Sequence, residues 1–305
     1  MTNSKTITYH FHNIDVCNMC LAPSSTQKVL GKRLNHSQGK KPSGLKGITT
    51  TIVKCKNCGL IFSNPLPVPQ SMSDHYGKPP EDYWVPQYFE LEPSYFQVEL
   101  SRLSKLIKID NGTKALDIGA GIGKCMAAMN NAGIDSYGFE PSEPFYERAL
   151  SKMKINPDRL KVASIETAEY ENNFFDFITF GAVLEHLYDP SESIAKALQW
   201  LKPGGIIHIQ VPSSDWLINK IANFYYKIAG TDYVANISPM HTPYHLYEFS
   251  VKSFAENAKR HNYEIAQVEY WVASTYMPKI ISGVLFNIMK WTKSGMQLEI
   301  WLRKK

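Results

Sequence analysis

The chain has 305 residues and a net charge of +5, with 44% hydrophobic and 20% charged residues. This composition is typical of a soluble globular protein with one large domain or two smaller ones. No apolar run reaches the about 18 residues that a transmembrane helix needs, and residues 1–17 lack the apolar core of a secretion signal. The composition therefore argues against a membrane-spanning or secreted protein and predicts a cytoplasmic one.

Positive charge is concentrated at the N-terminus. Residues 1–60 contain nine lysines or arginines and a single acid, Asp15. Such a segment could bind nucleic acid, a phosphorylated substrate or an acidic carrier, or its lysines could only keep a small domain soluble.

Four of the five cysteines form two CxxC pairs, Cys17 with Cys20 and Cys55 with Cys58. Each pair can point two thiolates at one ion, so the two pairs together match the closed four-cysteine geometry of structural zinc. Four unrelated thiols or a redox pair are the alternatives, but neither CxxC opens a helix in a βαβ unit. Residues 1–65 are therefore predicted to form a small zinc-ribbon-like module that metal binding stabilises.

An aromatic segment, residues 66–92, follows this module and is rich in Pro, Tyr and Trp. It is predicted to wrap over the next domain, because its aromatic side chains need a surface to cover. Helical spacing of apolar residues over 94–109, with an Asn-Gly stop at 111–112, predicts a helix. The main domain is assigned to residues 93–305.

Strand and helix patterns alternate along this main domain. Strands are predicted over residues 114–119, 136–141, 159–165, 174–180, 206–213, 263–272 and 296–305. Helices are predicted over residues 123–133, 143–153 and 190–205, and the fourth strand is expected to run directly into a further helix that reaches residue 187. Alternating β and α units predict a parallel α/β sheet covered by helices on both faces.

The stretch ALDIGAGIG places Asp117, Gly119, Gly121 and Gly123 where the first of these strands ends, and Glu140 ends the second. In such a sheet, ligands bind at the carboxyl ends of the strands, and an acid at this place can hold two ribose hydroxyls. The glycines fall as G-x-G-x-G, unlike the G-x-G-x-x-G of a pyrophosphate loop. Asp117 would disfavour a pyrophosphate but suits a ligand with an ammonium group and a sulfonium, which is S-adenosylmethionine.

The motifs LDIGAGIG, GFEPS, FFDFITFGAVLEHLYDP and LKPGG, in this order, resemble the class I S-adenosylmethionine-dependent methyltransferases. The resemblance covers residues 90–305 and implies a Rossmann-like seven-stranded sheet in the order 3-2-1-4-5-7-6, with strand seven antiparallel. It places the glycine loop near the methionine part of the cofactor and Glu140 on the ribose. Many members carry an acid after strand three that meets the adenine; here Ser164 is the substitute acceptor. The residues assigned to the cofactor are Asp117, Gly119, Ala120, Gly121, Gly123, Glu140, Pro141, Ser164, Ile165, Glu166, Gly181 and Glu185.

The two CxxC pairs, the Tyr-rich linker and the methyltransferase pattern together resemble a bacterial subgroup associated with polysaccharide or antibiotic sugar modification. This resemblance implies methyl transfer to a sugar or sugar nucleotide, with S-adenosylhomocysteine as the product and with structural zinc, and it leaves a homodimer open. An RNA methyltransferase that grips with the basic module, or a cofactor-binding protein without activity, are the alternatives. Nucleic acid is disfavoured because the basic residues lack interleaved aromatic ones.

Methyl transfer requires an aligned acceptor and a group that removes its proton, a role that histidine often fills near neutral pH. His245, in the segment PMHTPYHLYEFS, is predicted as the general base or a substrate-orienting group, since this segment resembles the acceptor-facing loop of the subgroup. His186, after the fourth strand, and His241 are further candidates. The alternative for His245 is a purely structural role at the start of the next helix. Glu185 is expected either to orient the cofactor or acceptor, or only to cap the local structure.

Two insertions carry apolar residues at helical spacing. Residues 213–240 are predicted to act as a lid over the acceptor, with a dimer helix or a membrane-surface helix as the alternatives. Residues 278–293 are more apolar and are expected to lean on the lid or on a partner.

Overall fold

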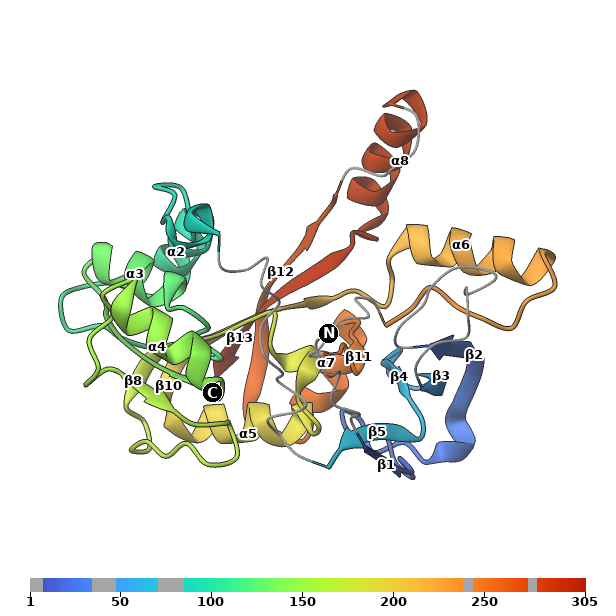
Figure 1. Ribbon diagram of the computed structural model, residues 1–305, viewed down its shortest axis with the longest axis horizontal. Coiled ribbons are helices and arrows are strands. Elements are labelled where there is room, and N and C mark those ends of the chain that lie inside the picture. The colour runs from blue at the N-terminus through green and yellow to red at the C-terminus, as the bar shows by residue number, and fades with distance from the viewer. Residues whose placement is uncertain (1–7, 35–47, 71–84, 238–243, 274–278) are drawn as a thin grey trace, which may run out of the picture.

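The computed structural model describes residues 8–34, 48–70, 85–237, 244–273 and 279–305 (Figure 1). Its largest element is a seven-stranded sheet in the order β8-β7-β6-β9-β10-β13-β12. In chain order these strands are β6 (Lys114–Ile118), β7 (Asp135–Glu140), β8 (Leu160–Val162), β9 (Phe175–Gly181), β10 (Leu201–Pro212), β12 (Tyr263–Trp271) and β13 (Gln297–Lys304). Strand β13 runs antiparallel to both neighbours, and the other pairs are parallel. Read from β8, this is the predicted order 3-2-1-4-5-7-6, so the predicted fold class is confirmed.

Neighbouring residues along each strand point to opposite faces of the sheet, and helices cover both faces. One face packs against α2 (Gln97–Leu106) and α3 (Lys124–Asn131), using Ala115, Phe177, Ile206 and Trp301. The other face packs against α5 (Pro190–Trp200) and α7 (Val251–Ala258), using the next residue of each strand, Leu116, Ile178, Ile207 and Leu302. Helix α4 (Glu143–Ser151) contributes Ala149 to a smaller cluster with Leu160 of β8. Because adjacent residues on these four strands are buried on opposite faces of the sheet, the strands read as continuous apolar runs in the sequence.

The segment after β9 differs from the sequence-based expectation. The prediction that this strand runs directly into a helix is wrong, because a single 3₁₀ turn, η5 (Leu184–His186), stands there. Helix α5 begins only at Pro190, since the residue before a proline disfavours helical geometry. The Asp189 side chain then caps α5 by accepting two backbone N–H groups of its first turn, both at 3.0 Å. The outcome is a short rigid turn that holds Glu185 and His186 at the carboxyl end of β9.

The N-terminal part, residues 8–34 and 48–69, forms what we call the cysteine module. Its strands are β1 (Tyr9–His12), β2 (Gln27–Leu34), β3 (Thr49–Cys55), β4 (Ile61–Ser63) and β5 (Leu66–Pro69). Strands β2, β3 and β4 form an antiparallel sheet whose fourth strand, β11 (Tyr247–Glu248), comes from the second half of the chain. Strand β1 pairs with β5, so the pairing of the module extends to Pro69. Residues 35–47, between β2 and β3, lie outside the described residues.

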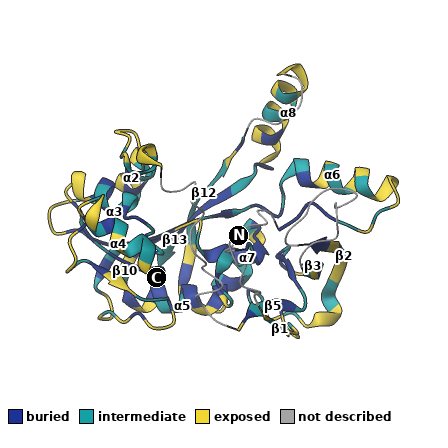
Figure 2. Ribbon diagram, in the orientation of Figure 1, coloured by how far each residue is buried: buried dark blue, intermediate teal, exposed yellow. Residues whose placement is uncertain are grey.

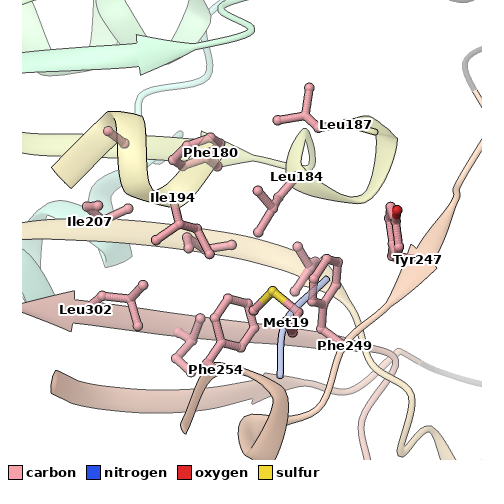
Figure 3. Packing of buried hydrophobic residues seen from close by; sticks show 14 of the residues in the cluster. Met19, Phe180, Leu184, Leu187, Ile194, Ile207, Tyr247, Phe249, Phe254 and Leu302 are labelled. Atoms are coloured by element: carbon pink, nitrogen blue, oxygen red, sulfur yellow. The ribbon is translucent and has the colours of Figure 1, made fainter. Parts of the chain in front are cut away.

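The cysteine module and the large domain share one continuous hydrophobic core. Met19 of the module lies beside Phe249 and Phe254 of the large domain (Figure 3). Next to this contact, the Ser250 hydroxyl donates a hydrogen bond to the carbonyl oxygen of Cys58 at 2.7 Å. Because apolar packing and a buried hydrogen bond both cross the boundary, the module is a fixed part of the body.

Two helices belong to the insertions noted in the sequence, α6 (Leu217–Ile228) and α8 (Lys279–Thr292). Helix α8 stands away from the sheet beyond β12 and β13 (Figure 1). The start of α6 lies next to the residues that follow α8, since the Leu217 backbone N–H donates to the Ser294 carbonyl at 3.1 Å. In the part of the chain that the structure describes, no helix combines the length and apolar character needed to cross a bilayer.

Candidate active site

The glycine loop connects β6 to α3 and lies against η5. Gly119 has a φ of +68°, and a Cβ at this position would come within 2.7 Å of the Val183 side chain. By contrast, a Cβ on Gly121 or Gly181 would meet no atom within 4 Å. The loop therefore packs closely on one side and faces open space on the other, which is the form of a cradle for a ligand.

Glu140, at the end of β7, is tied to this loop by its carboxylate. One oxygen accepts the Gly121 backbone N–H and the other accepts the Ser142 backbone N–H, both at 2.9 Å. Burial raises the pKa of Glu140 to about 6, although both hydrogen bonds act in the opposite direction. Each carboxylate oxygen retains a lone pair, so the group is fixed in position and can still accept ligand hydroxyls.

Asp117, at the end of β6, is a buried carboxyl group with only 3% of its surface exposed. Burial, and secondarily the nearby charge of Glu140, raise the pKa of Asp117 to about 8. A cationic ligand group beside Asp117 would favour its charged form. The electrostatics at this position therefore suit an ammonium group and oppose a phosphate.

Two cavities meet at the glycine loop and share Gly119, Gly121, Gly181 and Ala182. The first, of about 190 Å³, is flanked by the apolar side chains Ile118, Phe139, Phe145, Ile165 and Leu187 and also exposes Glu140 and His186. The second, of about 520 Å³, contains Asp117, Tyr88, Tyr95, Lys124, His208 and Gln210. The pair forms a crevice with an apolar compartment suited to a nucleobase and a polar compartment suited to an amino-acid group.

Most of the residues predicted for the cofactor line this crevice. They are Asp117, Gly119, Ala120, Gly121, Glu140, Pro141, Ser164, Ile165 and Gly181. Gly123 caps α3 instead, Glu166 lies outside both cavities, and Glu185 is buried behind them. Helix α6 of the 213–240 insertion lines neither cavity, so the lid stays a prediction.

The end of the linker and the first residues of the main domain contribute lining residues that the sequence did not single out. Tyr88, in η4 (Pro86–Phe89), and Tyr95 lie close to Lys124, whose Nζ is 4.9 Å and 5.9 Å from the two ring centroids. The Tyr95 hydroxyl also lies 3.8 Å from the thiol of Cys125. The only sequence signal for these residues is the aromatic richness of the linker, which predicted a covering role without saying what is covered.

Two of the three predicted catalytic histidines lie together beside the crevice. The His186 ring lies 3.0 Å, through Nδ1, from the Tyr244 carbonyl oxygen; since a carbonyl only accepts, Nδ1–H is the donor. The His245 ring centroid is 4.9 Å from that of His186, and its Nε2 is 3.6 Å from a carboxylate oxygen of Glu185. His241 lies outside the described residues.

Glu185 lies next to these two histidines. Burial raises the pKa of Glu185 to about 8, and its carbonyl oxygen accepts the Leu246 backbone N–H at 2.8 Å. The ligand atoms of Glu185, His186 and His245 lie within 4.8 Å of one another. This spacing fits either a metal site or a histidine base with a carboxyl group beside it. Only His186 lines the cofactor crevice, so it is the member of the cluster placed to meet an acceptor.

The four CxxC cysteines converge in the module. The Sγ atoms of Cys17 and Cys58 lie 3.5 Å apart, those of Cys20 and Cys55 lie 3.6 Å apart, and all four lie within 4.8 Å of one another. Sulfur atoms on a tetrahedral zinc, with Zn–S bonds of about 2.3 Å, are separated by about 3.8 Å. The cluster is therefore compatible with one tetrahedral metal ion and can hold it with no ligand position left open.

Filling the crevice from Gly181 should abolish cofactor binding without disturbing the fold. Gly181 does not have a left-handed φ, and a Cβ there meets no protein atom within 4 Å, so we expect Gly181→Leu to fold. Its side chain would occupy ligand space, and we expect affinity for S-adenosylhomocysteine to fall at least about 100-fold by calorimetry. Gly283→Leu is the matched control for folding, because Gly283 also lacks a left-handed φ, a Cβ there meets no atom within 4 Å, and it lies outside both cavities. Unchanged affinity in Gly181→Leu would place the ligand elsewhere.

The raised pKa of Asp117 predicts a pH-dependent affinity. Below about pH 8 the free protein keeps a proton on Asp117, whereas a bound ammonium group requires the carboxylate, so binding releases a proton. Affinity for S-adenosylhomocysteine should therefore rise with pH between about 6 and 7.5, by up to about tenfold per pH unit. Calorimetric titrations across this range measure the slope, and Asp117→Asn should flatten it. A slope that survives in Asp117→Asn would assign the proton to another group.

Comparison with known proteins agrees with this geometry. A family model described as a methyltransferase domain matches residues 89–268, more than half of the chain. A ubiquinone biosynthesis O-methyltransferase of Saccharophagus degradans is 30% identical over 133 residues, which are 42% of this chain and 54% of that protein. Its counterpart in Bordetella avium is 26% identical over 192 residues, 61% of this chain and 76% of that protein. The chain thus spans only about half of the first relative.

The fold is also similar to that of the PH0226 protein from Pyrococcus horikoshii OT3. The TM-score is 0.50, with 13% sequence identity, and the match covers 75% of this chain and all of that one. At this identity the likeness shows a shared fold alone. The family match, the sheet order and the crevice at the glycine loop together lead to one conclusion: the chain belongs to the methyltransferase-domain family.

Proposed function

We propose that this methyltransferase methylates a hydroxyl oxygen of a small aromatic acceptor and that His186 removes the acceptor proton. The observation that carries the proposal is the position of His186, which lines the cofactor crevice while its Nδ1 donates to the Tyr244 carbonyl. That hydrogen bond leaves the Nε2 position as the basic one in the neutral ring. Its placement favours His186 over His245, the first candidate from the sequence.

The residues of the crevice fit S-adenosylmethionine. Asp117 would hold the ammonium group, Glu140 the ribose hydroxyls, and the apolar compartment around Phe139 and Ile165 the adenine, with Ser164 within the same lining. The buried Ser142 hydroxyl, which has no hydrogen-bond partner among the described residues, is a further group available to it. The cofactor supplies a methyl group activated by a sulfonium.

His245 and Glu185 support the base in this proposal. A carboxyl oxygen of Glu185 lies 3.6 Å from Nε2 of His245, and the two imidazole rings lie edge to face. A proton on His186 would favour the ionised form of the neighbouring Glu185 carboxyl, whose pKa burial raises to about 8. His245 and Glu185 thus act as positioning residues.

An aromatic hydroxyl fits a histidine base better than a sugar hydroxyl does. A phenol has a pKa of about 10, within about 4 units of imidazole, whereas an alcohol is far less acidic. The relatives are named for O-methylation in ubiquinone biosynthesis, which agrees with an oxygen acceptor. The sugar or sugar-nucleotide acceptor predicted from the sequence, and its polysaccharide pathway, find no support among these relatives.

The four-cysteine cluster is proposed to hold structural zinc. The sulfur spacings support this assignment, and three of the four cysteines are fully buried. With four thiolates bound, the ion would have no position for a substrate or water, so its role is stability.

A binding assay followed by a transfer assay tests the function. S-adenosylhomocysteine at about 100 times its dissociation constant should stabilise the protein by about 2.7 kcal/mol, and Gly181→Leu should lose this stabilisation. Methyl transfer from labelled S-adenosylmethionine is then measured on catechols and on sugar nucleotides. Transfer to the catechols alone supports the proposal. Transfer to the sugar nucleotides alone would contradict the aromatic acceptor and restore the sequence-based prediction.

A further inference from the structure

Helix α6 is oriented with its polar side toward the protein and its apolar side toward solvent. Its inward face carries Asn219, which donates to Glu248 at 3.4 Å, and Asn223, which donates to Asn236 at 2.7 Å. The outward face carries the apolar side chains at positions i, i+3, i+4 and i+7: Ile221, Phe224, Tyr225 and Ile228. A surface helix of a globular protein normally has the opposite arrangement. The exposed stripe of α6 therefore indicates a surface that meets something other than water.

Helix α8 repeats this arrangement. Its exposed stripe is formed by Ile280, Val284, Ile288 and Trp291, at positions i, i+4, i+8 and i+11. Ile280 is 85% exposed and Trp291 is 86% exposed, while Met289, on the opposite side, is the buried residue of the helix. Figure 2 shows α8 as a projecting element with mostly exposed and half-buried residues. So many large apolar side chains on one projecting helix exceed the scattered exposure normal for a monomer.

The charged residues within the two helices all have one sign. Helix α6 carries Lys220 and Lys227, α8 carries Lys279 and Lys290, and neither helix has an acidic residue. The acids that flank α6 are paired: Asp215 with Lys220 at 3.1 Å and Asp232 with Lys32 at 2.9 Å. The surface is therefore apolar and aromatic with a cationic border.

We propose that α6 and α8 dock the protein onto an anionic phospholipid surface. Apolar and aromatic side chains on one face, bordered by lysines, are the features of a helix that lies in the interfacial layer of a bilayer. Helix α8 has 14 residues and is about 21 Å long, shorter than the about 30 Å of a hydrocarbon core, so it can lie in the interface but cannot cross it. Because both helices leave the body at the hydrogen bond between Leu217 and Ser294, one membrane surface can receive both.

A second copy of the chain fits this surface less well. A symmetric dimer would bring the same face of two copies together, and each copy would present only lysines as its charged groups. Like charges would then meet with no acidic partner on either helix. An anionic lipid surface supplies the complementary charge.

Vesicle cosedimentation of the full-length protein tests this proposal. With vesicles of phosphatidylcholine mixed with phosphatidylglycerol, we expect binding that weakens as salt is added, and with pure phosphatidylcholine we expect at least about tenfold weaker binding. The double variant Ile280→Ser/Trp291→Ser should lower the affinity for the mixed vesicles at least about tenfold. Lys227→Ala and Lys279→Ala should each lower it about fivefold.

Val29→Ser is the matched control, since Val29 is an apolar side chain with 63% exposure on β2, outside both stripes. This variant should bind vesicles like the wild type. The thermal shift with S-adenosylhomocysteine should be the same in all variants, which shows that they are folded. Vesicle binding that is insensitive to Ile280→Ser/Trp291→Ser would overturn the proposal. So would a dimer in sedimentation velocity that this double variant dissociates, together with no vesicle binding.

Discussion

Replacing His186 with alanine should lower kcat for methyl transfer by about 10²- to 10⁴-fold, the usual contribution of a general base. The ring lines the crevice and is oriented by the Tyr244 carbonyl, so its removal leaves the acceptor hydroxyl without a proton acceptor. Affinity for S-adenosylhomocysteine should change little, because Asp117 and Glu140 carry the cofactor contacts in our proposal. Single-turnover kinetics and calorimetry on the same preparation separate the two effects.

Controls distinguish this role from the alternatives at the same cluster. His12→Ala, at an exposed histidine on β1, should behave like the wild type. His245→Ala should reduce kcat less than His186→Ala and should shift the pH profile, because His245 acts on the base through position. If His245→Ala proves the more damaging change, the sequence-based assignment of His245 as base is the correct one. Activity abolished by EDTA and restored by a divalent ion would instead assign Glu185, His186 and His245 to a metal.

Replacing Cys55 with serine should lower the free energy of unfolding by more than about 4 kcal/mol, because loss of a structural metal is among the largest single-site effects. Cys55 ends β3, lies 3.6 Å from Cys20 through its sulfur and is fully buried. Metal analysis of the wild-type protein should give one zinc per chain. Chemical denaturation of the wild type and of Cys55→Ser measures the difference.

The same change should reach the active site. Strand β4 of the module pairs with β11, which begins three residues after Tyr244, the partner of His186. Loosening the module therefore removes support from the carbonyl that orients the base, and kcat should fall with stability. Val29→Ser is the control, since Val29 lies on β2 of the same module, is 63% exposed and is not a proposed ligand. A fully stable, metal-free wild-type protein would contradict the assignment of zinc.

The parts of the molecule that the sequence predicted correctly depend on local patterns. The strand-and-helix alternation predicted a parallel α/β sheet, and the resemblance to the methyltransferase family supplied its strand order. The glycine loop and Glu140 were found since their chemistry lies within one βαβ unit. The helix predicted directly after β9 is wrong, because Leu184–His186 form a single 3₁₀ turn there.

The parts that the sequence did not predict depend on contacts between distant segments. His186 and Tyr244 are 58 positions apart, so the orientation of the ring is set by a fold-level contact. Tyr88 and Tyr95 reach the crevice through the path of the chain before α2, and the linker in this part of the chain has no periodic pattern. The outward apolar faces of α6 and α8 are invisible to periodicity alone, because a helical stripe has the same spacing whether it faces the core or solvent.

The origin of β11 limits how this protein can be divided. A two-residue strand from the second half of the chain completes the sheet of the cysteine module, and Met19 of the module fills part of the core around Phe249. Cutting the gene between the two parts would leave an unpaired strand edge and an apolar hollow on the catalytic fragment. Such a fragment should aggregate instead of serving as a minimal enzyme, so the N-terminal module and the enzyme must be inherited, expressed and engineered as one unit.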